Sequence, residues 1–106
     1  MAAIGVAALA GAARLPRPAD PVARHHVVEI RGMAFHPEVV EVRRGDTVVW
    51  INRDIVPHTA TASRTEEWTT GPLSQGAQGT LVPDRRGDEA YFCEFHPTML
   101  GTLIVR

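Results

Sequence analysis

The sequence lacks lysine altogether, contains one cysteine, and has no apolar stretch long enough to cross a membrane as a helix. The single cysteine, Cys93, excludes an internal disulfide. The 11 basic residues are all arginine and are balanced by 12 acidic residues, which argues against a nucleic-acid partner. The 106 residues suffice for one domain. No repeat of roughly 20–50 residues indicates a solenoid.

The longest apolar stretch lies at the N-terminus, where residues 2–13 are small and apolar. A membrane-spanning helix needs about 20 such residues, so we do not expect stable membrane insertion. The length fits the apolar part of a secretory signal peptide. We therefore interpret residues 1–13 as a signal peptide or its remnant. This predicts an exported, periplasmic or otherwise extracytoplasmic protein, associated with a membrane if the segment stays uncleaved. A terminus without a targeting role is the alternative.

Residues 14–24 contain three prolines and are predicted to form an extended linker. The folded domain is then expected to span residues 25–106. That part has 8 arginines and 11 acidic residues, so it is mildly acidic. No segment of it shows the helical period over ten or more residues.

Short runs of β-branched and aromatic residues, separated by turn residues, predict strands in this domain. The expected strands are residues 26–30, 38–43, 47–52, 59–62, 78–82, 90–95 and 102–105. About seven or eight short strands with frequent turns indicate an all-β fold, a Greek-key antiparallel β-sandwich. Trp50 and Trp68 are expected to belong to its core.

The segment of chemical interest carries Cys93, His96 and Met99 at intervals of three residues, and His58 lies upstream at another strand junction. Thiolate and thioether are soft ligands, and imidazole suits copper. Two histidines and one cysteine with a weak axial methionine form a blue-copper electron-transfer site. Zinc also takes cysteine and histidine, although methionine is a poor zinc ligand. A cysteine nucleophile with a histidine base would leave Met99 and the second histidine unexplained.

With these residues in place, the domain resembles the cupredoxins, the small blue copper proteins of the plastocyanin, pseudoazurin and amicyanin group. The Cys-x-x-His-x-x-Met loop is most similar to that of amicyanin. Further similar segments are residues 42–52 (VRRGDTVVWIN), 57–59 (PHT) and 101–105 (GTLIV). The resemblance implies a cupredoxin-like sandwich that binds one type 1 copper ion through His58, Cys93, His96 and Met99. It also implies a soluble one-electron carrier rather than an enzyme.

The chain departs from the family pattern at three places. Thr59 stands where many cupredoxins have an asparagine that ties the two ligand loops together. Glu89 stands where a tyrosine is frequent, four residues before the cysteine. Between the cysteine and the second histidine, relatives commonly have Thr-Pro, whereas this chain has Glu94 and Phe95. A negative charge at Glu94, so close to the metal, is expected to lower the reduction potential.

The resemblance further implies that His96 reaches the surface and that redox proteins dock around it. The apolar residues expected there are Pro57, Phe95, Pro97 and Leu100. Redox contacts are small and transient, so a modest patch would suffice. We also expect a monomer. An exported protein for copper storage, delivery or resistance without electron transfer is the alternative. A β-sandwich interaction module without metal is a third interpretation. An oxidase or nitrite reductase would require a second copper site, and the sequence shows no further histidine cluster for one.

Overall fold

The computed structural model describes residues 22–64 and 67–106. The predicted leader, residues 1–13, and most of the predicted linker therefore lie outside the described residues. Within the described ranges the chain forms strands, turns and loops, with no helix. Accordingly, no helix in this part of the protein has the length and apolarity that crossing a membrane requires.

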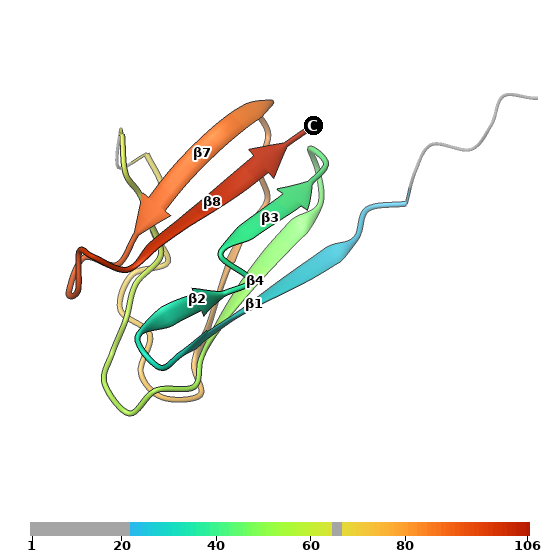
Figure 1. The fold of residues 1–106 in the computed structure, drawn as a ribbon. Coiled ribbons are helices and arrows are strands. Elements are labelled where there is room, and N and C mark those ends of the chain that lie inside the picture. Colours follow the sequence, from blue (N-terminus) through green and yellow to red (C-terminus); the bar gives the residue numbers. More distant parts are fainter. Residues whose placement is uncertain (1–21, 65–66) are drawn as a thin grey trace, which may run out of the picture.

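The described chain folds into two four-stranded sheets packed face to face (Figure 1). The first sheet has the order β2-β1-β4-β6 and the second the order β3-β8-β7-β5. The strands are β1 (His25–Arg31), β2 (Ala34–His36), β3 (Val39–Val42), β4 (Thr47–Asn52), β5 (Thr61–Ala62), β6 (Gln78–Leu81), β7 (Gly87–Phe92) and β8 (Leu100–Val105). The prediction of an all-β sandwich with seven or eight short strands is thus confirmed.

Both sheets are mixed rather than purely antiparallel. β1 pairs in parallel with β4, and β3 pairs in parallel with β8, whereas the other four pairings are antiparallel. The parallel β1–β4 pair arises because the chain leaves the first sheet after β2, forms β3 in the second sheet, and returns. The sequence analysis did not predict β2, a three-residue strand. It forms a hairpin with β1 through Gly32 and Met33, whose φ angles of 59° and 60° suit a tight two-residue turn.

The core lies between the sheets because alternate residues of the strands point inward. In β4, every second side chain is buried, ending with Trp50 and Asn52. Trp50 stacks on Trp68 with ring centroids 5.5 Å apart, and Tyr91 contacts both rings. Trp50 is fully buried and Trp68 packs against the core while partly exposed, as expected for both.

At one end of the sandwich, the buried carboxylate of Asp46 organises the start of the first sheet. It accepts hydrogen bonds from the backbone N–H groups of Arg24 and Arg43 and bonds to the ring of His26 at 2.8 Å. These hydrogen bonds lower the pKa of Asp46 to about 2; the bond from Arg24 lowers it most, followed by those from Arg43 and His26. The ionised side chain therefore stabilises the fold.

We expect Asp46→Asn to reduce the free energy of unfolding at neutral pH, because an amide loses the charge that these three donors satisfy. A depressed pKa stabilises the fold above the ordinary value of 3.8, and this contribution disappears as the pH falls towards about 2. Urea titrations across that interval should therefore show a flatter pH dependence for Asp46→Asn than for the wild type. The exposed Asp84→Asn serves as the control. An unchanged slope for Asp46→Asn would contradict this assignment.

Candidate metal centre

Two loops at the other end of the sandwich bring the predicted ligands together. His58 lies in the segment between β4 and β5, and residues 93–99 connect β7 to β8, at the left of Figure 1. The Sγ atom of Cys93 lies 3.6 Å from Nδ1 of His58 and 3.9 Å from Nδ1 of His96. One potential ligand atom from each of these residues lies within 4.8 Å of the others. The cluster is thus formed by residues 35 positions apart in sequence.

The loop that carries three of the candidates is closed by its own backbone. The N–H of Cys93 donates to the carbonyl of Met99 at 3.2 Å, and the N–H of Met99 donates to the carbonyl of His96 at 2.9 Å. The N–H of His96 donates back to the carbonyl of Cys93 at 3.2 Å. Cys93 and Met99 are buried, whereas His96 is partly exposed. The short spacing thus gives a compact turn that holds all three residues at this end of the sandwich.

His58 is held from two sides. Its backbone forms an isolated bridge with Leu73, with hydrogen bonds of 3.1 and 2.8 Å in the two directions. Its ring atom Nε2 lies 2.9 Å from the Oδ2 atom of Asp54. The ionised carboxylate accepts a hydrogen bond, so Nε2 carries a proton, and Nδ1, the atom that faces Cys93, is the one available to a metal. His58 itself is completely buried.

Asp54 is in turn fixed by the β1–β2 turn. The backbone N–H groups of Gly32 and Met33 donate to its two carboxylate oxygens at 2.8 and 3.0 Å. Desolvation opposes its ionisation, but the hydrogen bonds from Met33, His58 and Gly32 outweigh it, and the pKa of Asp54 is lowered. Asn52, also buried, donates to the carbonyls of Val56 and Leu73 and accepts from the N–H of Asp54. Neither residue was predicted from the sequence, although an acid four positions before His58 was a usable signal.

We expect Asp54→Ala to weaken metal binding by about 10- to 100-fold, the usual effect of removing the partner of a metal-binding histidine. Without the carboxylate, the ring of His58 is free to carry its proton on Nδ1, the atom that faces Cys93. The affinity can be measured by competition with a chelator of known strength. Asp84→Ala, an exposed acid at the opposite end, is the matched control. Equal affinities for the two variants would rule out this role for Asp54.

The thiol of Cys93 receives a hydrogen bond across the two loops, because the backbone N–H of Thr59 lies 3.3 Å from Sγ. The N–H of Glu94 in turn donates to the hydroxyl of Thr59 at 2.9 Å. Thr59 thus ties the two ligand loops together even though it replaces the asparagine frequent in cupredoxins. At the departure at position 89, the carboxylate of Glu89 accepts a hydrogen bond from the indole N–H of Trp68 at 3.0 Å.

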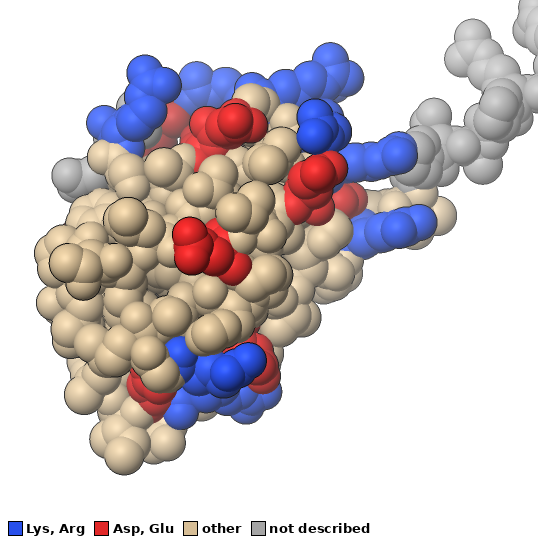
Figure 2. Space-filling view, viewed as in Figure 1, with Lys and Arg blue, Asp and Glu red and all other residues tan. Residues whose placement is uncertain are grey.

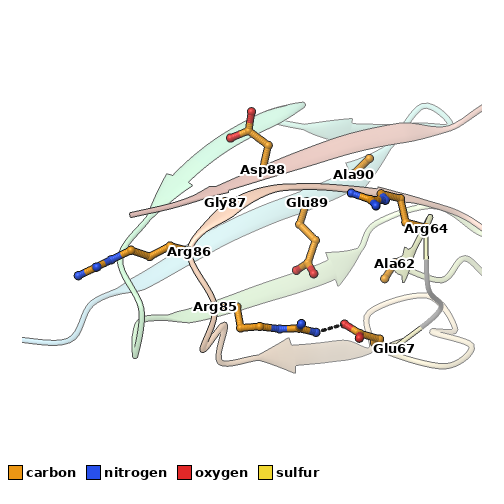
Figure 3. A pocket seen from close by; sticks show the side chains of 9 residues that line it. All are labelled: Ala62, Arg64, Glu67, Arg85, Arg86, Gly87, Asp88, Glu89 and Ala90. Carbon is orange, nitrogen blue, oxygen red and sulfur yellow. Dashed lines mark hydrogen bonds and ion pairs between the residues drawn. The ribbon is translucent and has the colours of Figure 1, made fainter.

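A surface hollow near Glu89 contains none of the candidate ligands (Figure 3). Its charged side chains are of both signs, and Arg85 pairs with Glu67 across it. The residues that line it are Ala62, Arg64, Glu67, Arg85, Arg86, Gly87, Asp88, Glu89 and Ala90. The mixture of charges favours neither an anion nor a cation.

The donor set at the cluster fits copper better than the other metals. Two imidazole nitrogens and the sulfur of Cys93 converge at a largely buried position, with only His96 partly exposed, and the thioether of the buried Met99 belongs to the same loop. Hard cations prefer oxygen ligands, and the three clustered groups that the structure describes contribute no carboxylate. Copper takes imidazole, thiolate and thioether in both of its common oxidation states. A buried site without carboxylates therefore suits a soft, redox-active ion.

Comparison with known proteins supports this chemistry. Residues 22–106 match the model of the copper-binding proteins of the plastocyanin/azurin family. Amicyanin from Paracoccus denitrificans is 34% identical over 83 residues, which are 74% of this chain and 63% of that protein. Amicyanin from Paracoccus versutus is 32% identical over 92 residues, covering 83% and 67% of the two chains. The chain thus spans slightly less than two thirds of the length of the Paracoccus denitrificans relative.

The fold agrees with that of a solved cupredoxin. The purple cupredoxin from Nitrosopumilus maritimus superposes with a TM-score of 0.71 at 26% identity, over 76% of this chain and 99% of that one. The family model covers every candidate ligand and both sheets. The chain therefore belongs to the plastocyanin/azurin family of copper-binding proteins and is a cupredoxin similar to the amicyanins.

Proposed function

We propose that the protein is a one-electron carrier that binds one type 1 copper ion through His58, Cys93, His96 and Met99. The observation that supports this most directly is the convergence of two Nδ1 atoms on the Sγ of Cys93, within 3.9 Å. When bound, copper supplies the Cu(II)/Cu(I) couple. The residues of the chain position the ligands and exclude water.

The two histidines would have different roles because their exposure differs. His58 is completely buried and its ring is fixed by Asp54, which favours a constant geometry in both oxidation states. His96 is partly exposed and belongs to the loop at the surface. A partner can therefore approach the centre closely through the ring of His96. Electrons would enter and leave by this ring.

Redox proteins are proposed to dock on the apolar residues around His96. Phe95 is 48% exposed and Leu100 is 59% exposed; Pro57 and Pro97 are exposed as well. On the face seen in Figure 2, the end of the molecule that carries the loop between β7 and β8 shows mostly uncharged residues. Glu94 is the exposed acid of that loop. A small apolar surface fits a transient contact between proteins. The protein would act as a monomer. Its N-terminal sequence favours export to the periplasm or another extracytoplasmic compartment.

The first experiment is a visible spectrum of the purified protein after addition of Cu(II), followed by reduction and reoxidation. A carrier should show an intense thiolate-to-Cu(II) absorption band that ascorbate bleaches and a mild oxidant restores. Fast electron self-exchange would support a carrier over a protein for copper storage, delivery or resistance. Tight Cu(I) binding without a reversible potential would instead favour copper handling, and zinc binding without the band would reject the copper site.

A further inference from the structure

A closed ring of hydrogen bonds joins the ligand loop to the neighbouring segments, and Glu94 is both its first and its last member. The backbone N–H of Glu94 donates to the hydroxyl of Thr59 at 2.9 Å. The hydroxyls of Thr59 and Thr61 are 3.0 Å apart, and Thr61 donates to the carboxylate of Glu94 at 2.9 Å. The hydroxyl of Thr69 lies 2.7 Å from that of Thr61. We refer to Thr59, Thr61, Thr69 and Glu94 as the threonine ring.

The number of available protons fixes the direction of these bonds. A carboxylate has no proton to donate, so the one hydroxyl proton of Thr61 points to Glu94. Thr59 must then donate to the oxygen of Thr61. The hydroxyl of Thr69 lies 2.7 Å from that oxygen and 3.5 Å from the carboxylate of Glu94, so we assign its proton to the shorter contact, with Thr61. The bonds run in one direction from the amide of Glu94, through two hydroxyls, back to its own carboxylate. Bonds aligned in this way polarise and strengthen one another.

Thr59 connects the ring to the metal centre. The hydroxyl of Thr59 belongs to the ring, while its backbone N–H lies 3.3 Å from the Sγ atom of Cys93. Thr59 follows His58 directly, and Glu94 follows Cys93 directly. Thr59 and Thr61 are buried, with exposures of 1% and 2%. A break in the ring would therefore leave a buried hydroxyl without its partner next to two candidate ligands.

We propose that the threonine ring is a positioning device, in which the carboxylate of Glu94 acts through Thr61 and Thr59 to hold the thiolate of Cys93 in place. This inference rests on the copper site of the proposed function. It assigns Glu94 a second role beside its charge, because the carboxylate is bound by Thr61. The hydrogen bonds of the ring thus tie the two ligand loops together, as an asparagine side chain does in related proteins. Through Thr61 they also connect the loops to Thr69.

Three variants separate the ring from the charge. Thr61→Val removes the central hydroxyl at nearly constant volume and leaves the charge of Glu94. Glu94→Ala removes both the acceptor and the charge, whereas Glu94→Gln removes the charge but keeps an oxygen that can accept from Thr61. The exposed Thr80→Val in β6 and Glu38→Gln are the matched controls. Neither control contacts the ring.

The first readout is amide hydrogen exchange of Glu94 and Thr59 in the metal-free protein, measured by NMR. If the ring positions the loop, Thr61→Val and Glu94→Ala accelerate both exchanges, and Glu94→Gln restores most of the protection. Exchange in Thr61→Val equal to that in Thr80→Val would overturn the proposal. Because no metal is present, this result stands even if the wild type shows no blue band.

The second readout is the copper-loaded protein. We expect Thr61→Val to lower the Cu(II) affinity about tenfold, as for other groups that hold metal ligands, and to shift the thiolate-to-Cu(II) band. Glu94→Gln should change the reduction potential more than the band. If Glu94→Gln and Glu94→Ala behave alike and Thr61→Val behaves like the controls, the charge alone acts and the positioning role is wrong.

Discussion

Replacement of Cys93 by serine is expected to abolish the intense visible band. It should also reduce the Cu(II) affinity by more than about 100-fold, because loss of a residue that merely hydrogen-bonds a metal ligand already costs up to about 100-fold. The band requires a thiolate, and an alcohol does not ionise at neutral pH in its place. Cys93 is completely buried and its Sγ atom is the point on which both imidazoles converge. No other thiol exists in the chain to replace it.

The fold should survive this change. Serine is close in size to cysteine, and its hydroxyl can accept the hydrogen bond from the N–H of Thr59. We expect the metal-free variant to lose about 1 kcal/mol of stability, a common effect of a single substitution. The exposed Thr80→Val in β6 is the control, because it leaves all four proposed ligands in place and should keep the band. Retention of the intense band in Cys93→Ser would reject Cys93 as a ligand.

The second large effect is expected at Gly101, on β8. A Cβ atom added there would lie 2.2 Å from Cζ of Tyr91 and 2.5 Å from its hydroxyl oxygen. Tyr91 is completely buried and packs edge-on against Phe35 and Trp50, so its ring has no room to withdraw. We expect Gly101→Ala to cost about 3 kcal/mol, at the upper end for an overpacked core. Chemical denaturation of the metal-free protein measures this loss.

Gly45→Ala provides the comparison. Gly45 has a φ of 89° but no atom within 4 Å of an added Cβ, so its substitution carries only the cost of a left-handed backbone, about 1–2 kcal/mol. A loss at Gly101 no larger than that at Gly45 would mean that Tyr91 repacks easily. A large loss at Gly101 should also weaken metal binding, because Tyr91 lies near the end of β7, two residues before Cys93.

The sequence predicted the strands whose side chains alternate clearly, such as Thr47–Asn52, because a half-buried strand has a period of two. It did not predict β2, whose three residues are too few to show a period. It predicted antiparallel pairing for the whole sandwich, whereas β1–β4 and β3–β8 are parallel. The choice of partner strand depends on contacts between distant residues, which local patterns do not contain.

The metal cluster was predictable for a related reason. The interval of three residues between Cys93, His96 and Met99 places three donors on one turn, so local spacing carries most of the signal. The groups that hold those donors come from elsewhere in the chain. Thr69 reaches the loop from 25 residues before Glu94, and its hydroxyl resembles any surface threonine in the sequence. Only the folded chain reveals that it belongs to the site.

The parallel pairing of β3 with β8 has a consequence for the order of folding. Val39, near the beginning of the domain, lies beside Thr102, near its end, and β7 also needs β8 as its neighbour. Contacts between residues so far apart form slowly, because a long chain segment must be closed first. The second sheet is therefore expected to close only when residues 100–105 join it. Until then the loop after Cys93 lacks the strand that anchors its far end, and the thiol is expected to stay accessible to oxidants and to stray metal ions.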